Sequence, residues 1–167
     1  MTEILLCEAL KDKVIEAIKD IKLQNPVGDL VTPEVLNGLL PPNNRSESDY
    51  PCVVIRLEES LAELETTEVV VRISICTYDE CLDENGQELR PVKGYEDGLN
   101  VASRIRLALQ TLSGGVLSRR YALRFPIALQ NSAADDYPYW QVDLVTRWLL
   151  RNPVPVCDFT GGFNGIK

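Results

Sequence analysis

Cysteine and carboxylate side chains are the main candidates for chemistry in this chain, because the sequence contains no histidine. The absence of histidine excludes Ser-His-Asp and Cys-His catalysis, histidine-ligated zinc and the usual proton shuttle near neutral pH. General acid–base catalysis would need a pair of carboxylates or a lysine with a lowered pKa. No such pair has a recognisable signature here. The sequence therefore predicts no catalytic residues and a protein that is not an enzyme.

The cysteines do not form a metal-binding or disulfide pattern. No Cys-x-x-Cys is present, and only Cys76 and Cys81 are close in sequence, whereas a structural zinc site requires two close pairs. The number of cysteines is odd, which does not suit a secreted disulfide framework. We expect reduced thiols in a cytoplasm, no metal site and no cofactor. The five residues are Cys7, Cys52, Cys76, Cys81 and Cys157.

Two acidic motifs could be read as ligand or catalytic sites. When Gly86 is aligned with the turn glycine of a calcium-binding loop, Cys81 falls on the first ligand position and Val92 on the bidentate position, and neither can bind calcium. The acidic segment over residues 79–93 is therefore interpreted as a surface turn. The adjacent carboxylates Asp135-Asp136 are interpreted as turn residues, with a catalytic dyad as the less favoured interpretation.

Two amphipathic helices must position whatever site the protein has. The first is predicted over 3–22 and the second over 95–112, because apolar residues recur in each at steps of three and four. Gly114-Gly115 supplies a left-handed exit from the second helix. The apolar ladders are Cys7, Leu10, Val14, Ile18 and Ile21, and then Tyr95, Leu99, Ala102, Ile105, Leu109 and Leu112.

Four β-strands are predicted from alternating apolar and polar residues. The clearest has Val69, Val71 and Ile73 on one face, a pattern typical of an antiparallel strand with one wet side. Pro126 indicates an edge strand or a bulge, because proline cannot donate a ladder hydrogen bond. The predicted strands cover 51–60, 67–78, 120–129 and 138–150.

The order of these elements predicts one α+β domain over 1–150, with a four-stranded, mainly antiparallel sheet and two helices packed on one face. Within it, 23–51 is predicted to be a long Pro-rich loop containing a short helix from Thr32 to about Leu39. An extended C-terminal arm is predicted over 151–167. No apolar stretch approaches the roughly 20 residues that a membrane span requires, so no contact with a membrane is expected.

Charge is unevenly distributed along the chain, whose net charge is -8. Residues 58–97 contain twelve acidic and three basic residues, whereas 99–151 contains seven basic and three acidic ones. In one interpretation, folding mixes these charges over an ordinary solvated surface, so that no charged patch results. In the other, acidic and basic patches form, and they bring neighbouring copies of the protein together. The acidity and the lack of a basic-aromatic motif argue against sequence-specific nucleic-acid binding. An acidic protein could still surround DNA as a conduit.

The layout resembles the tail terminator and tail-completion proteins of long-tailed bacteriophages and prophages, which include minor tail and head-tail joining proteins. The resemblance covers about residues 3–150 and begins with the leading amphipathic helix and the Pro-rich loop. It continues through Asp49 to Ile55, the strand Val69 to Tyr78, the helix that starts at Gly94 and the aromatic strand around Tyr139-Trp140.

This resemblance implies a structural virion protein that assembles into a homo-oligomeric ring, commonly a hexamer, at the head-tail joint. Its partners would be further copies of itself, the tail tube and the head-connector proteins, and it would have no enzymatic activity and no cofactor. It would reside in the cytoplasm of the bacterial host during assembly and then in the virion tail. The main alternative is a small-molecule-binding or regulatory α+β domain of a bacterial housekeeping protein. A carboxylate-dependent hydrolase is a third interpretation.

Overall fold

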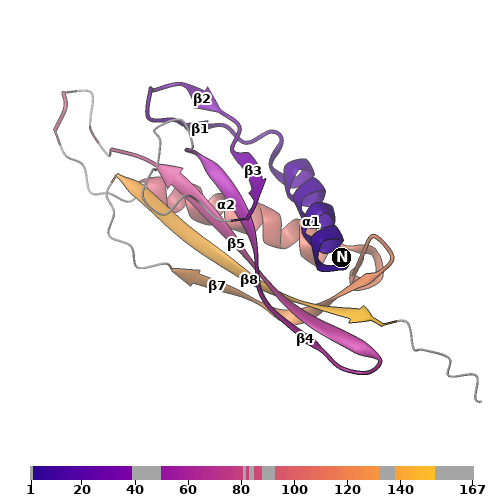
Figure 1. The fold of residues 1–167 in the computed structure, drawn as a ribbon. Helices are drawn as coiled ribbons and strands as arrows, with labels where there is room; N and C mark the ends of the chain where they lie inside the picture. The colour runs from indigo at the N-terminus through magenta and orange to yellow at the C-terminus, as the bar shows by residue number, and fades with distance from the viewer. Residues whose placement is uncertain are drawn as a thin grey trace, which may run out of the picture.

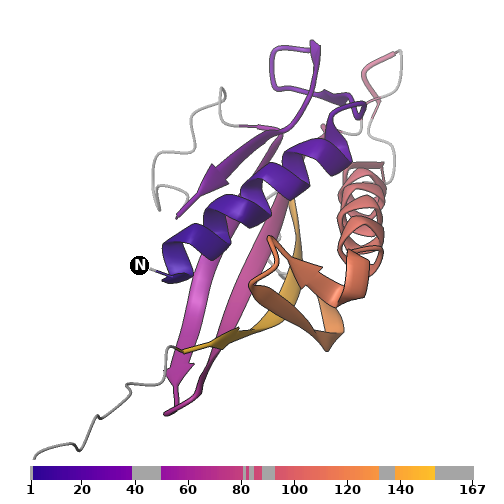
Figure 2. The ribbon, with the colours of Figure 1, turned by 90° about the vertical axis from the view of Figure 1, so that its right-hand side faces the viewer.

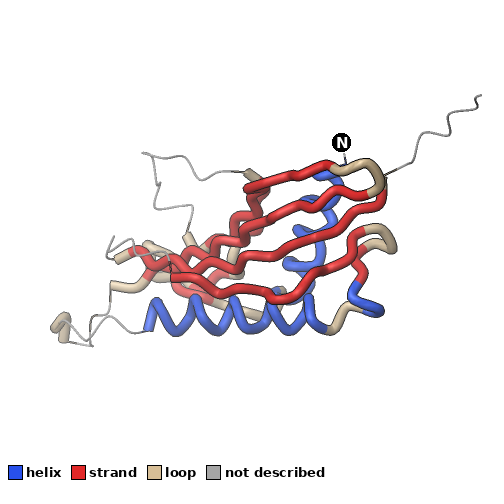
Figure 3. The backbone as a smooth tube through the Cα atoms, turned by 90° about the horizontal axis from the view of Figure 1, so that it is seen from below, coloured by secondary structure: helices blue, strands red, loops and turns tan. Residues whose placement is uncertain are grey.

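A curled β-sheet carries two helices on one of its faces (Figures 1 and 3). The computed structural model describes residues 2–38, 50–80, 82, 85–87, 93–131 and 138–152. The strand order of the main sheet is β3-β4-β5-β8-β7-β6. The elements are α1 (Thr2–Ile18), β1 (Leu23–Gln24), β2 (Leu30–Val31), β3 (Glu34–Asn37), β4 (Cys52–Ala62), β5 (Thr66–Tyr78), α2 (Lys93–Gln110), the 3₁₀ turn η2 (Ser113–Gly115), β6 (Val116–Leu117), β7 (Tyr121–Asn131) and β8 (Tyr139–Arg151).

The predicted four-stranded, mainly antiparallel sheet is wrong. The main sheet has six strands and is mixed, because β3 pairs in parallel with β4 at one edge. The short β6 extends the other edge, and β1 and β2 form a separate two-stranded sheet. The central strands β4, β5, β8 and β7 correspond to the four strands that alternation indicated. The added strands are two to four residues long, too short for alternation to identify.

The helix predicted from Thr32 to Leu39 is also wrong, since residues 34–37 form the strand β3. Val35 is buried against the core, and β3 pairs with Cys52–Ile55 of β4. A helix of this length would be marginal alone, whereas the sheet supplies both hydrogen-bond partners and a core contact. Residues 39–49 and the arm beyond Asn152 lie outside the described residues, so the predictions made for them have no structural counterpart here.

The long helices lie close to their predicted positions but end earlier. α1 stops at Ile18, where the Ile21 amide donates to the Ile18 carbonyl at 2.9 Å and closes a turn. α2 spans Lys93–Gln110. Gly114 and Gly115 both have positive φ, at 63° and 67°, which confirms the left-handed exit. None of the helices in the described ranges is both long and apolar enough to cross a membrane.

The main core lies between the helices and the inward face of the sheet. Trp148 of β8 is fully buried there, and its indole N–H donates to the Thr146 hydroxyl at 2.9 Å. The Thr146 hydroxyl in turn donates to the Val71 carbonyl at 3.0 Å, so the chain of buried polar groups is satisfied. This core fixes which residues of β4, β5, β7 and β8 face outward, away from the helices. Its apolar members include Leu6, Leu10, Val14, Val53, Ile55, Ile73, Ile105, Leu109 and Leu144.

Candidate functional site

The cysteines do not meet at one place. Cys7 of α1 is half-buried, and burial raises the pKa of its thiol. Cys52 and Cys76 face each other across β4 and β5 in a second buried cluster with Tyr50, Val54 and Tyr78. No group of three metal-binding side chains occurs within the described ranges. The other two cysteines, Cys81 and Cys157, fall outside those ranges, and so do the carboxylates Asp135-Asp136.

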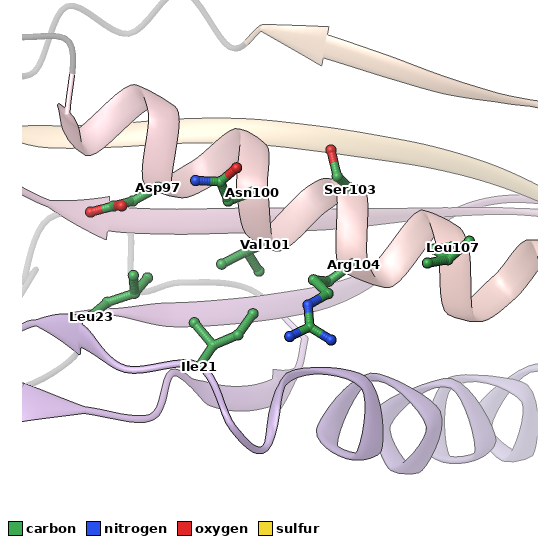
Figure 4. A pocket seen from close by; sticks show the side chains of 8 residues that line it. All are labelled: Ile21, Leu23, Asp97, Asn100, Val101, Ser103, Arg104 and Leu107. Carbon is green, nitrogen blue, oxygen red and sulfur yellow. The ribbon is translucent and has the colours of Figure 1, made fainter.

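A groove of about 460 Å³ separates α2 from the segment that follows α1 (Figure 4). Ile21 and Leu23 form one wall, and Val101 faces them from α2. Arg104 also lines the groove, but its guanidinium is bound to Asp20 at 2.9 Å. The groove is therefore mainly apolar. Its remaining lining residues are Asp97, Asn100, Ser103 and Leu107.

Asp97 is the carboxylate that lines this groove. Its burial raises the pKa of Asp97, and nearby Asp79 and Glu96 raise it further, whereas Lys93 opposes the shift. A hydrolase of the carboxylate type needs a second carboxylate aimed at the same space. Among the described residues, no other acidic side chain lines the groove. Its geometry therefore suits the packing of apolar groups better than acid–base chemistry.

The outward face of the sheet is held together by a hydrogen-bonded ion network around Arg72 of β5. Its guanidinium binds both oxygens of Glu58 of β4, at 2.5 and 3.0 Å, and donates to Asp143 of β8 at 2.8 Å. A longer bond of 3.3 Å reaches Gln130 of β7. Gln141 donates to the other oxygen of Asp143 at 3.0 Å. One arginine thus ties together four neighbouring strands, and its hydrogen bonds hold the pKa of Glu58 below its usual value.

The β4–β5 hairpin forms an acidic surface, here called the acidic hairpin and defined as residues 58–65. All eight residues are exposed, and in Figure 2 the hairpin extends past the ends of both helices. β3 covers only Cys52–Ile55, so within the described residues no strand pairs with the outer edge of β4 from Arg56 onward. The acidic hairpin carries Glu58, Glu59, Glu63 and Glu65 together with the exposed Leu61 and Leu64.

Asn152 fixes the turn of the acidic hairpin from the end of β8. Its side-chain amide donates to the Glu63 carbonyl at 2.8 Å, and its backbone amide donates to the Glu65 carbonyl at 2.8 Å. The Thr67 hydroxyl donates to the side-chain oxygen of Asn152 at 2.8 Å. The Glu63 amide and the Thr66 carbonyl, 2.7 Å apart, close the turn itself. The hairpin is therefore held in one conformation by a residue 85 positions or more away in sequence.

Replacing Asn152 by Ala should destabilise the protein by about 1–3 kcal/mol, because two side-chain hydrogen bonds are lost and the Thr67 hydroxyl loses its acceptor. Urea unfolding followed by circular dichroism measures this change. The matched control is Gln130→Ala, which removes one long hydrogen bond at an exposed residue of β7. Equal loss in the two variants would contradict the role assigned to Asn152.

A basic surface, here called the arginine corner, lies around the β6–β7 turn and the end of β8. It consists of Arg119, Arg120, Arg124 and Arg151, all of which are exposed. No ion pair links these four arginines to an acidic residue within the described part of the chain. The corner borders a groove of about 730 Å³ whose other lining residues are Val116, Tyr121, Ala122, Leu149 and Leu150.

Strand order separates the two charged surfaces across the sheet. The acidic hairpin belongs to β4 and β5, and the arginine corner belongs to β8, β7 and β6. They adjoin where Thr66 pairs with Arg151, but the ion pair that bridges the two halves there is the long contact of 3.6 Å between Arg147 and Glu68. Within the described residues, the acidic hairpin and the arginine corner therefore lie next to each other at one end of the sheet, on different strands.

Comparisons with known proteins identify no family. No protein-family model and no curated protein matches the chain. Among solved structures, the chain is similar to one in a structure described as "Virion of native gene transfer agent (GTA) particle". The TM-score is 0.45 and the identity 13%, over 88% of this chain and 95% of that chain. That neighbour is part of a virion particle, but a likeness of this degree is too low to carry an argument about function.

Sequence reasoning found the segregation of charge but not the residues that organise it. Arg72, Asp143 and Asn152 have no distinguishing local context, and only strand pairing brings them to Glu58, Gln130 and the hairpin turn. Arg72 lies at an outward position of its strand, as the alternation indicates. The nearest sequence signal is that Arg72 follows three valines and precedes Ile73, but this does not indicate its partners.

Proposed function

We propose that this protein is a structural virion component of a bacteriophage or prophage, a tail terminator or tail-completion subunit that forms a ring at the head-tail joint. The observation that carries the proposal is that one end of the sheet presents the acidic hairpin on β4 and β5 next to the arginine corner on β8, β7 and β6, whose arginines make no ion pair within the described residues. Two different surfaces that meet head to tail generate a closed ring when the rotation between copies closes.

The family resemblance of the sequence supports the same interpretation. Under this proposal the partners are further copies, the tail tube and the head-connector proteins. The subunit acts by shape and contact, without catalysis and without a cofactor. A net charge of -8 suits a conduit for DNA, because like-charge repulsion keeps the DNA backbone from sticking. The protein would assemble in the host cytoplasm and remain in the virion tail.

A small-molecule-binding domain is the second candidate, and the groove beside α2 is the observation that favours it. Such sites are mostly apolar with a few convergent polar groups. The groove has the apolar lining, but the Arg104 guanidinium is already bound to Asp20. In contrast, Glu59, Glu63 and Glu65 and the four arginines of the corner make no ion pair within the described chain. We therefore favour assembly over ligand binding.

Sedimentation velocity and negative-stain imaging of the purified protein test the proposed ring. We expect a discrete oligomer, commonly a hexamer, seen as rings with a central opening. Assembly should weaken as salt rises, because exposed charges are screened over about 8 Å at physiological ionic strength and about 3 Å at 1 M. A monomer at every concentration, with or without isolated tail tubes, would contradict the proposal.

A further inference from the structure

We propose that the acidic hairpin of one copy docks against the arginine corner of the next copy. This inference rests on the proposed ring for its biological setting, but the contact itself can be tested independently. It assigns the lateral interface to two named surfaces of the same chain. The occupant of the arginine corner is thus a second copy of this protein.

The two surfaces match in their apolar content. Leu61 and Leu64 on the acidic hairpin are 57% and 76% exposed, so both side chains are available to a partner. The groove beside the arginine corner has an apolar floor that includes Val116 and Leu149. A leucine-bearing hairpin entering such a groove would bury apolar surface at the centre and leave the charges at the rim, as protein interfaces usually do.

The two surfaces also match in charge. Glu59, Glu63 and Glu65 make no ion pair within the described residues, and neither do the four arginines of the corner. In one chain the two surfaces adjoin where Thr66 pairs with Arg151, yet no ion pair joins these carboxylates to these arginines within the described residues. A second copy supplies the missing opposite charges to both surfaces. Complementary charges of this kind mainly raise the rate and specificity of association.

The arginine corner is maintained at a conformational cost. Ser118 and Arg119 of the β6–β7 turn both have left-handed backbones, with φ of 50° and 59°. Glycine or asparagine is the usual residue at such positions. The Arg120 amide still donates to the Leu117 carbonyl at 3.1 Å, so the turn is well formed. Strained backbone positions cluster at functional contacts, so an arginine held where glycine would fit better is consistent with a contact at this point.

Reciprocal charge reversal tests the contact. The hairpin variant carries Glu59→Lys, Glu63→Lys and Glu65→Lys, and the corner variant carries Arg119→Glu, Arg120→Glu and Arg151→Glu. Each alone should lose assembly, with association weakened about 100-fold or more at low salt, because like charges then face each other. Mixing the two variants should restore assembly, since each opposed pair of surfaces is again of opposite sign.

The mixture separates failure of the contact from failure of the ring. A restored complex that contains equal amounts of both variants and has the size of the wild-type ring supports both proposals. A restored complex that stops at two copies supports the contact and contradicts the ring. Assembly of either variant alone, at wild-type strength, overturns the contact but leaves the ring standing. A wild-type protein that stays monomeric at low salt overturns both.

Two further variants test whether a loss of assembly comes from misfolding or from the change in net charge alone. Arg119→Gly relieves the left-handed strain, so it should keep or raise the unfolding temperature while weakening assembly. Loss of assembly together with loss of fold would overturn the inference. The charge control is Glu8→Lys, Asp12→Lys and Asp29→Lys, which changes the net charge as much as the hairpin variant does, at exposed sites away from the hairpin. It should assemble like the wild type, and equal loss in this control would overturn the inference.

Discussion

Replacing Arg72 by Met should destabilise the protein by roughly 2–4 kcal/mol, between the cost of an unsatisfied polar group and that of a broken buried ion pair. Asp143 is only 2% exposed, so the substitution would leave a buried carboxylate that has lost its arginine partner and keeps the hydrogen bond from Gln141. Glu58 would lose both of its hydrogen bonds to this guanidinium. Urea unfolding measures the loss as a lower midpoint at unchanged slope.

The matched control is Arg147→Met on the neighbouring strand. Arg147 also lies on the outward face, but its side chain is 57% exposed and reaches Glu68 only at 3.6 Å. Exposed pairs contribute about 0–1 kcal/mol, so this variant should change stability little. Adding Asp143→Asn to Arg72→Met should recover part of the loss, because the uncompensated charge is removed. No recovery, or equal losses in both arginine variants, would contradict the assigned network.

The difference in stability between the wild type and Arg72→Met should depend on pH, because Glu58 loses its arginine partner in the variant. The hydrogen bonds of Arg72 hold the pKa of Glu58 below its ordinary value of 4.5 in the folded protein. A lowered carboxyl pKa contributes stability that is fully present above the ordinary value and is lost as pH falls through the folded value. The gap between wild type and Arg72→Met should therefore be widest near neutral pH and narrow below about pH 4.5.

How far the fold could be predicted depended on the length of each element. The two helices and the four long strands are long enough for apolar residues to recur at the helical or strand period. The left-handed exit at Gly114-Gly115 follows from residue type alone. Pro126 indicated an edge strand or a bulge, and the β7–β8 register does shift between Arg124 and Ala128. In contrast, β3 is stabilised by pairing with β4, and a local Thr-Pro-Glu signal for a helix was overridden by that tertiary contact.

The candidate site was predictable only as a charge pattern. The acidic and basic segments could be counted from the sequence, but their placement on particular strands of one sheet depends on the order β4-β5-β8-β7. That order puts the last long strand between the second and third ones. No local rule states which strands become neighbours when loops of this length connect them. The partners of Arg72 and Asn152 were hidden for the same reason.

Replacing Gly94 by Ala should lower stability by about 1–3 kcal/mol, because overpacking at this point outweighs the gain in helix propensity of about 1 kcal/mol. An added Cβ would lie 2.3 Å from Cδ1 of Trp140 and 2.9 Å from Cβ of Asp79. Trp140 has little freedom to move, since its indole N–H donates to the Asp79 carbonyl at 3.3 Å. The Thr77 hydroxyl also holds the Gly94 carbonyl at 2.7 Å.

Gly98, one helical turn further along α2, provides the graded comparison. Its added Cβ would lie 3.1 Å from Cγ2 of Val142, a contact that a shift of a few tenths of an ångström relieves. Gly98→Ala should therefore cost less than Gly94→Ala or be neutral, once helix propensity is included. Thermal unfolding of both variants tests this order. If Gly94→Ala were as stable as Gly98→Ala, α2 would not depend on a glycine to pack closely on β5 and β8, and the position of its first turn would have another cause.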